Sequence, residues 1–540
     1  MERARYKTHD CKYLDAAKLA VDWTEATLVR EDGGTYNDYR SSWSGTTTFA
    51  QIALGKTLLS YGMQLPQDVR DRWMRIFCRE TQFLKAKFSD QQFVGRVNVN
   101  YPAAYCEAMA IAGKLLGAPE YIVLAKQMAS RLYRQFLPSG LLMGEGHPMD
   151  ASSPRGRRYI DLGYNLEETL PALLGYAEIA DDRRMEALVV TSACAHLEFL
   201  LPDGALDNSF GSRSAKWTYY GSRTTDGFCA LLGKLARRGV PWAIRALDRH
   251  LRLLERCTLG NGLLAGGLNY ADADEPACVH HSFTHAKSLV DLLQCDIPVT
   301  SVETALPRET AQGVRDYPEL GVQLVSVGPW RATFSASDAF MGPSQLTVGG
   351  GSPTLLWRAD TGPLILGSMS EYFFVEEHNM QDLRHERKVL TTTPHFEANG
   401  CFSCADLAAE VTTRLENGVF ILESRGRLCN AKRTSGPTYE TKWSLSEKDF
   451  TMKGKCAENS SFVLPLVVTA RDDVRIKNTK VTISNPTKLI VVESSHRPKL
   501  KQTDRGERAF TPVAGALTAQ IYFDIPKEEF AEIRIRVLAK

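Results

Sequence analysis

The stretch from Ile297 to Gly313, IPVTSVETALPRETAQG, separates two parts of the chain whose apolar residues repeat with different periods. It contains two prolines, which are disfavoured inside helices and central strands. Before this stretch the apolar spacing is helical, and after it short runs alternate apolar with polar residues. The sequence therefore predicts two domains: a helical domain over residues 1–300 and an antiparallel β domain over residues 301–540.

The part before Ile297 contains nine segments in which apolar residues recur every three or four positions. Pro102 opens one of them, and Gly117 closes it. The predicted helices are residues 43–61, 67–87, 102–116, 119–136, 167–180, 182–199, 225–238, 240–257 and 282–294. Because the helices are similar in length and no repeat of fixed period is present, we expect a bundle or an incomplete (α/α) toroid.

The part after Gly313 contains runs rich in β-branched and aromatic residues, with Gly, Asn, Asp and Pro between them. The predicted strands are VQLVSV (322–327), RATFSAS (331–337), PTLLWRA (353–359), EYFFVEE (371–377), GVFILES (418–424), SFVLPLVVTA (461–470), KLIVVES (488–494) and LTAQIYFDI (517–525). Several of these runs alternate apolar with polar residues, which predicts a large antiparallel sheet or a β-sandwich.

The composition excludes some classes of protein. The 540 residues have 44% hydrophobic and 24% charged content and a net charge of +2, which gives no global bias toward nucleic acid. Neither an apolar leader segment nor an apolar run of membrane-spanning length is found. We therefore expect no nucleic-acid or membrane partner. The expected location is the cytoplasm, or the periplasm or exterior if an export signal has been removed.

The 12 cysteines are scattered along the chain, and only Cys401 and Cys404 form a CxxC pair. A structural zinc site needs a second pair of ligands, which the sequence does not supply. Reduced thiols that pack in the interior are the preferred interpretation. No metal site is predicted.

A long polar segment, GEGHPMDASSPRGRRYIDLGYNLEE, runs from Gly144 to Glu168 within the helical part. It is too rich in Gly, Pro and Ser to be helical throughout, and such insertions between helices often carry function. Its candidate site residues are His147, Tyr159, Tyr164 and Asn165.

A second unusual segment runs from Pro202 to Gly227 and mixes arginines with aromatic residues. Aromatic faces stack on sugar rings, and guanidinium groups bind carboxylates or sulfates bidentately. Single-stranded nucleic acid would use the same residue types, but no nucleic-acid motif is present. The candidates here are Asn208, Arg213, Trp217, Tyr219, Tyr220 and Arg223.

Three further segments of the chain complete the set of candidates. Asn98 and Asn100 precede a helix in RVNVNYP, where capping is the alternative role. His281 and His285 stand four apart and share one helix face, although no HExxH motif surrounds them. His378 follows a predicted strand in FFVEEHN.

This order of parts and clusters resembles the (α/α)-toroid polysaccharide lyases, which include the heparinase II/III-like, chondroitin, hyaluronan and alginate lyases. Asn100 matches the asparagine at the start of a toroid helix in that group. His147 and Tyr164 resemble its His followed by Tyr, Arg213 or Arg223 resembles its arginine, and His378 resembles a histidine supplied by the β domain.

The chain departs from the group at three points. Asn100 is followed by Tyr where many members have His, the gap from His147 to Tyr164 is longer, and Asn165 stands where Gly follows the tyrosine. Tyr159 and Asn98 therefore remain alternative candidates for the tyrosine and asparagine roles.

The resemblance implies β-elimination on a uronate-containing, glycosaminoglycan-like polysaccharide, giving 4,5-unsaturated products. Asn and Arg would neutralise the substrate carboxylate, while Tyr164 or His147 would move the protons. No cofactor is required, and a divalent metal is not indicated. The expected partner is an anionic polysaccharide or oligosaccharide.

Two alternatives stay open. A glycoside hydrolase would need two carboxylates beside the scissile bond. The available acids are Glu145, Asp150, Asp161, Glu167, Glu168 and Asp207. A non-catalytic glycan-binding protein would use only the arginines and aromatic residues of the segment 202–227.

Overall fold

The computed structural model describes residues 11–37, 43–89, 95–146, 148–222, 227–273, 275–277, 279–297, 304–339, 347–372, 388–501, 507–511 and 513–538. The chain divides into two compact units. The first comprises Met1–Ala151, Tyr164–Ala195 and Val290–Gln294, and the second comprises Ser152–Gly163, His196–Leu289 and Cys295–Lys540.

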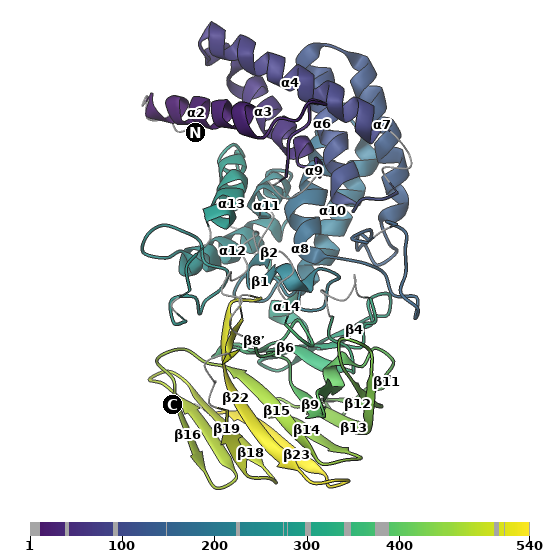
Figure 1. Cartoon of the computed structure of the whole chain (residues 1–540), viewed down its shortest axis with the longest axis vertical. Coiled ribbons are helices and arrows are strands. Elements are labelled where there is room, and N and C mark those ends of the chain that lie inside the picture. The colour runs from purple at the N-terminus through teal and green to yellow at the C-terminus, as the bar shows by residue number, and fades with distance from the viewer. Residues whose placement is uncertain are drawn as a thin grey trace. The chain divides into compact units, whose positions relative to one another are not determined.

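The first unit is helical, and helix α6 lies at its centre. Its helices are α2 (Lys12–Thr27), α3 (Thr47–Tyr61), α4 (Gln67–Phe88), α6 (Asn100–Leu116), α7 (Pro119–Leu132), α9 (Leu170–Ala180) and α10 (Arg183–His196). The short helix α8 (Leu162–Tyr164) contains residues of both units, because the first unit resumes at Tyr164. Helix α6 packs against α3, α4, α7 and α9 (Figure 1). It tolerates this crowding because most of its buried side chains are small, five of them alanines.

Close approach of helices α6 and α9 depends on Gly175. A Cβ atom at this position would lie 2.0 Å from Oε1 of Glu107. Glu107 is buried, and its charge is compensated by Lys56 on α3, whose Nζ lies 3.1 Å away. The same Lys56 Nζ lies 3.4 Å from Asp291, so this one ammonium group contacts acids from two other segments.

The remaining helices belong mainly to the second unit. They are α11 (Cys229–Arg237), α12 (Ala243–Cys257), α13 (Val279–Leu292) and the short α14 (Pro307–Thr310). All nine predicted helices are confirmed, with ends that shift by a few residues. Helix α2 was not predicted, because it buries only Leu14 and therefore shows a weak apolar pattern.

Two antiparallel sheets follow in the second unit. A five-stranded sheet has the order β3 (Gly313–Tyr317), β4 (Val322–Val327), β5 (Trp330–Ser335), β6 (Ser352–Arg358) and β7 (Gly362–Leu366). A fourteen-stranded sheet has the order β16-β17-β18-β23-β14-β13-β12-β10-β9-β15-β22-β19, with β11 beside β12 and β21 beside β22. Figure 1 shows several of these strands side by side in green to yellow.

The strands of the large sheet begin and end as follows. They are β9 (His395–Ala398), β10 (Cys401–Phe402), β11 (Glu410–Glu416), β12 (Val419–Cys429), β13 (Ser435–Leu445), β14 (Asp449–Cys456), β15 (Ser460–Val467), β16 (Asp473–Lys477), β17 (Lys480–Ser484), β18 (Leu489–Ser494), β19 (Pro498–Leu500), β21 (Phe510–Thr511), β22 (Ala516–Ile525) and β23 (Ala531–Val537). Two-residue pairs also form between β1 (Trp217–Thr218) and β2 (Gly221–Ser222), and between β8 (Lys388–Val389) and β20 (Glu507–Arg508). Seven of the eight predicted strands are confirmed, and most of the eighth, EYFFVEE, lies outside the described residues.

One apolar core joins the two sheets into a sandwich. Alternate residues of β23 face this core, so Ala531, Ile533 and Ile535 are buried while Glu532 and Arg534 are exposed. Aromatic rings from both sheets meet in it. Phe334 of the small sheet lies 5.1 Å from Phe420 of the large one, ring centroid to ring centroid, which explains the aromatic content of these runs.

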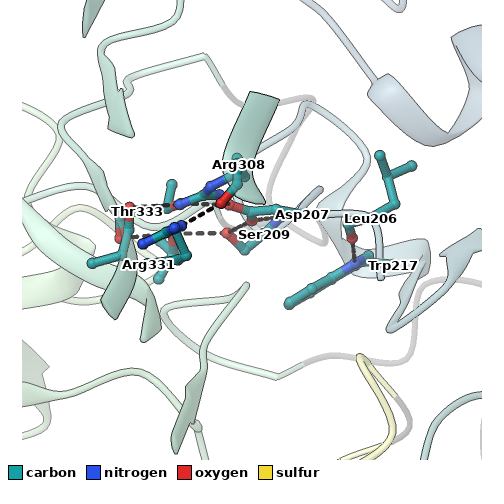
Figure 2. A network of polar contacts seen from close by, with 9 residues as sticks. Leu206, Asp207, Ser209, Trp217, Arg308, Arg331 and Thr333 are labelled. Atoms are coloured by element: carbon teal, nitrogen blue, oxygen red, sulfur yellow. Dashed lines mark hydrogen bonds and ion pairs between the residues drawn. The ribbon is translucent and has the colours of Figure 1, made fainter. Parts of the chain in front are cut away.

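Leu306 and Arg308, in the stretch that separates the two patterns, are buried, although its sequence resembles that of a linker. Helix α14 places Arg308 inside the second unit, where its side chain is 2% exposed and its Nη1 lies 3.1 Å from Oδ2 of Asp207. Thr333 and Ser209 also donate to Asp207, Ser209 at 2.7 Å (Figure 2). Residues 306–308 are therefore not simply a solvent-exposed connection, although the change from helices to strands occurs here.

A second buried guanidinium lies beside the first. Arg331 donates through its Nη atoms to the carbonyls of Gly328, Trp330 and Glu309, at 2.8, 2.7 and 3.1 Å, and through Nε to the carbonyl of Arg308. Burial, and then the charge of Arg308, lower the pKa of Arg331 to about 10. The Asp207 carboxylate thus partly compensates a cationic cluster in the interior.

The first unit also contains a buried acid. Glu80 on α4 is 3% exposed and lines a cavity of about 320 Å³ among α2, α3 and α4. Its Oε2 has no hydrogen-bond partner among the residues that the structure describes. Burial raises the pKa of Glu80 to about 8, against an opposing effect of Arg79.

Among the described helices, none combines the length and the apolar character that a membrane-spanning segment needs.

We expect the substitution Asp207→Ala to lower the free energy of unfolding by about 3–5 kcal/mol, because it leaves Arg308 buried without its counter-charge. The double variant Asp207→Leu/Arg308→Met should lose less than Asp207→Ala alone, since it removes both charges. Chemical denaturation of the whole chain measures both effects. The control is Asp248→Ala, which breaks an exposed pair with Arg252 and should cost less than about 1 kcal/mol. Equal losses for Asp207→Ala and Asp248→Ala would contradict the role of the pair.

We expect Glu80 to make stability depend on pH. Its pKa is higher in the folded protein than in the unfolded chain, because burial disfavours the charged carboxylate. The free energy of unfolding is therefore highest below about pH 4.5 and falls as the pH rises toward 8. Glu80→Gln should therefore stabilise the protein by on the order of 3 kcal/mol at pH 7 and have little effect at pH 4.5. Tm values of both proteins between pH 4.5 and pH 8 give the comparison, with the exposed Glu120→Gln as control. A Tm difference that does not change with pH would disprove this assignment.

Candidate active site

Tyr164 stands at an irregular turn of helix. The α-helical turn Leu162–Tyr164 is followed by a π-helical turn, Asn165–Thr169, before α9 begins at Leu170. The wide turn is seen in the bond from the Leu170 amide to the Asn165 carbonyl, five residues back. Pro171 favours it because it has no N–H to continue the α-helical ladder. Such π turns are common at functional sites.

Three segments of the first unit meet at this turn. Asn100, the first residue of α6, donates from Nδ2 to Oε2 of Glu168 at 2.7 Å. Asn165 donates from Nδ2 to the carbonyl of Leu142 at 2.7 Å. The Val99 amide donates to the carbonyl of Gly144 at 2.9 Å. The start of α6, the start of the long polar segment and the π turn are therefore held together.

The predicted residues Asn98, Asn100, Tyr164 and Asn165 all belong to this junction. All four are buried. Glu168, the partner of Asn100, is half-buried. It stands four residues after Tyr164, so the two residues lie on the same side of the helical turn. The Oδ1 atoms of Asn98 and Asn100 are buried and have no hydrogen-bond partner within the described part of the chain. Sequence reasoning gave Glu168 only as one of several acids, and its spacing from Tyr164 is the signal that was missed.

The chain enters this turn from a loop of the second unit that Asn208 holds in place. Asn208 donates from Nδ2 to Oδ1 of Asp161 at 3.0 Å and accepts from the Leu162 amide at 3.2 Å. Gly211 allows this packing, since a Cβ atom there would lie 2.5 Å from Oδ1 of Asn208. Asn208 was predicted to bind substrate. Its side chain instead makes internal bonds that position the residues before Tyr164.

The predicted aromatic surface is an interior cluster. Trp217, Tyr219 and Tyr220 are each 0% exposed. The indole N–H of Trp217 donates to the Leu206 carbonyl at 2.7 Å, as Figure 2 shows, and the Tyr219 hydroxyl donates to Asp203 at 2.8 Å. Burial, and then the Asp203 carboxylate, raise the pKa of Tyr219 well above its ordinary value. Composition showed these rings but not their burial, and as packed they offer no face on which a sugar could stack.

The two histidines of α13 join the same cluster. The Tyr220 hydroxyl lies 2.8 Å from Nε2 of His281, and the ring centroids of His281 and His285 are 4.8 Å apart. Both histidines are buried, as expected for positions that share a helix face. No group of three or more His, Cys, Asp or Glu side chains in the described ranges could hold a metal ion.

Tyr159 and Arg213 are the predicted residues of the second unit with exposed surface. Burial, and then the Asp338 carboxylate, raise the pKa of Tyr159, so it retains its proton more firmly than an ordinary tyrosine. Arg213 is half-exposed at the start of a short 3₁₀ turn, Ser214–Lys216. His147, Arg223 and His378 lie outside the described residues.

At least three of the six acids that a hydrolase could use make contacts with other side chains of the protein. Asp207 is paired with Arg308, and Asp161 accepts from Asn208. Glu168 accepts from Asn100. The candidate site is therefore a junction of helices that brings together the Asn100 amide, the turn that follows Tyr164, and the Glu168 carboxylate.

Two family models and one curated relative match this chain. The model of the ulvan lyase N-terminal domain matches residues 2–309, and that of the ulvan lyase C-terminal domain matches residues 314–539. A broad-specificity ulvan lyase from Formosa agariphila is 34% identical over 546 residues, which cover 97% of this chain and 84% of that enzyme.

Solved structures show the same fold. A heparinase III structure matches with a TM-score of 0.53 at 11% identity, over 99% of this chain and 76% of that chain. The chondroitin AC lyase of Streptomyces coelicolor A3, in complex with chondroitin sulphate, matches with a TM-score of 0.50 at 14% identity, over 91% of this chain and 67% of that chain. The predicted fold class, an (α/α) toroid followed by an antiparallel β-sandwich, is confirmed.

The resemblance to the toroid polysaccharide lyases is likewise confirmed, and neither the hydrolase nor the binding-protein alternative has support. The chain belongs to the ulvan lyase family and is a polysaccharide lyase that acts on uronic-acid polysaccharides.

Proposed function

We propose that the protein cleaves ulvan by β-elimination at a uronic acid, with Tyr164 as the proton carrier. The observation that carries the choice of substrate is the 34% identity to an ulvan lyase over nearly the whole chain. The observation that carries the choice of residue is the contact between Asn100 and Glu168 on the turn that begins with Tyr164.

The chemistry follows from the acidity of the substrate. A base removes the C5 proton beside the carboxylate, the electron pair forms the C4–C5 double bond, and the C4–oxygen bond breaks. The departing oxygen receives a proton, so no water is consumed. A tyrosine can perform both transfers, provided that a nearby cation helps it to lose its proton.

The buried amides at the junction supply hydrogen bonds to the reacting sugar. Asn100 has two amide hydrogens, and Glu168 binds one of them. The second hydrogen, with the amide of Asn98, is available to the substrate carboxylate as charge develops on it. Arg213 and Arg223 are the proposed cations, and His147 and His378 are proposed to complete the site on the strength of the resemblance.

We expect ulvan to give the fastest rise in ultraviolet absorbance when the protein is incubated separately with ulvan, alginate, chondroitin sulfate and heparan sulfate. The conjugated 4,5-unsaturated uronate produced by elimination absorbs, whereas a hydrolysed end does not. A parallel assay of reducing ends separates the two reactions. Reducing ends without absorbance would contradict β-elimination, and preferential cleavage of chondroitin or heparan sulfate would contradict the choice of ulvan.

We expect Tyr164→Phe to lower kcat by about 10² or more, the usual loss when general acid–base catalysis is removed. The ring is retained, so Tm should change little. Tyr159→Phe is the matched control, because it deletes a hydroxyl five residues earlier and should lose far less. If Tyr159→Phe were the more damaging variant, the proton carrier would be Tyr159 and the proposal for Tyr164 would be wrong.

A further inference from the structure

A cavity of about 320 Å³ lies in the first unit, among helices α2, α3 and α4 (Figure 1). Small side chains leave this space between the helices. Four of the residues that line it are alanines, Ala17 and Ala20 on α2 and Ala50 and Ala53 on α3. Every lining residue belongs to the first unit. The volume falls within the range of small-molecule sites, about 300–1,000 Å³.

Helix α4 forms the floor of this cavity. Trp73, Ile76 and Glu80 line it from α4, and each of them is at most 7% exposed. Ala20 and Ala53, which line it from the other two helices, are exposed. The cavity therefore opens to solvent between α2 and α3, and its apolar floor contains one acid.

Glu80 brings a carboxyl group to this floor that the protein leaves partly unsatisfied. Its Oε2 atom is buried and has no hydrogen-bond partner in the described part of the chain. The two hydroxyls that line the cavity are already used, since Thr24 and Thr57 donate to the carbonyls of Ala20 and Ala53, each at 2.9 Å. A buried polar group without a partner is costly, so a ligand that pairs with the Glu80 carboxyl gains by doing so.

The charges around the cavity favour a cation as that ligand. Arg79, next to Glu80 on α4, binds Glu25 of α2 through both Nη atoms, at 2.6 and 2.8 Å. One guanidinium group thus stands beside two carboxyl groups and is turned toward Glu25. Among the described residues that line the cavity from α3, none is ionisable. Ionised Glu80 would therefore leave one negative charge without a partner, which a bound cation compensates.

We propose that this cavity binds a small organic cation, an alkylammonium ion whose charged group pairs with Glu80 and whose alkyl chain covers Trp73 and Ile76. A metal ion fits the cavity less well, because it requires several oxygen ligands and the floor offers one carboxyl group. A neutral alcohol would fill the same space and leave the charge of Glu80 without a partner. Binding at this site does not depend on the proposed cleavage of ulvan.

Binding of the cation should release a proton. Burial raises the pKa of Glu80 to about 8, so at pH 7 the free protein holds this carboxyl mainly in its neutral form. The ammonium ion pairs with the carboxylate, and the proton of Glu80 passes to the buffer. The other charged groups beside Glu80 are Glu25 and Arg79, which form their own pair. Affinity for the cation should therefore rise about tenfold from pH 6 to pH 7 and level off above pH 8.

We expect n-hexylammonium to bind the whole protein more tightly than n-hexanol, a neutral molecule of the same length, in isothermal titration calorimetry. Titrations in buffers of different ionisation enthalpy should show about one proton released per cation at pH 7 and close to none at pH 9. Glu80→Gln keeps the shape of the side chain and removes its charge. It should weaken hexylammonium binding about tenfold or more and change hexanol binding less than about twofold.

Two further variants complete the test. Glu120→Gln is the matched control, because it removes an exposed acid of α7, and it should bind both probes like the wild type. Ala50→Leu fills part of the cavity and should weaken the binding of both probes. The Tm of each variant without ligand shows that it is folded. Glu80→Gln is expected to raise Tm at pH 7, so its loss of binding would not result from unfolding.

Four results would overturn the proposal. They are no detectable binding of hexylammonium to the wild type, unchanged affinity in Glu80→Gln, equal affinities for hexylammonium and hexanol, and cation binding at pH 7 without release of a proton. Hexylammonium affinity that is unchanged in Ala50→Leu would place the cation outside the cavity and would also contradict it.

Discussion

The contact between Asp207 and Arg308 is the constraint on which much of the second unit depends. It joins a loop that follows α10 to helix α14, which precedes β3, although the two residues are 101 positions apart in the sequence. Asp207 is followed directly by Asn208, whose side chain fixes Asp161 and the Leu162 amide. A buried ion pair is a weak source of net stability, but it is costly to break, so it favours one arrangement of these loops. The position of the chain just before Tyr164 thus follows from a charge pair far away in sequence.

The secondary structure could be predicted from the sequence because burial imposes a period. The strand β4 was predicted with its observed bounds, Val322–Val327, whereas β23, whose residues also alternate between buried and exposed, was not predicted. The stretch around Arg308 could not be interpreted correctly in this way. A stretch with two prolines and three charged residues is typical of an exposed linker, and only the distant partner Asp207 compensates the charge of the buried Arg308. Long-range charge pairing leaves no local pattern in a sequence.

Part of the candidate site could be proposed from the sequence, because some of its residues lie in short recognisable motifs. Asn100 and Tyr164 were proposed because short motifs and the resemblance mark them, and the structure holds their segments together. Trp217 and Tyr220 were misjudged, because an aromatic side chain beside glycines and arginines has the same composition whether it faces solvent or the core. The contact of Trp217 with the Leu206 carbonyl depends on the fold of the whole loop. Side-chain exposure, unlike helix or strand period, is a property of the tertiary structure.

The environment of Asn100 limits how the charge of the reaction can be compensated. A neutral amide contributes about 1 kcal/mol of net hydrogen bonding, and one of its two hydrogens is already bound by Glu168. A carboxylate on the same side of the turn as Tyr164 also opposes a second negative charge there, whether on the phenolate or on the substrate. Under the proposed mechanism, the Asn100 amide would therefore orient the reacting sugar and compensate only a small part of the charge that develops on its carboxylate. A positively charged group would have to supply the remainder, which is the reason for proposing arginines for that role.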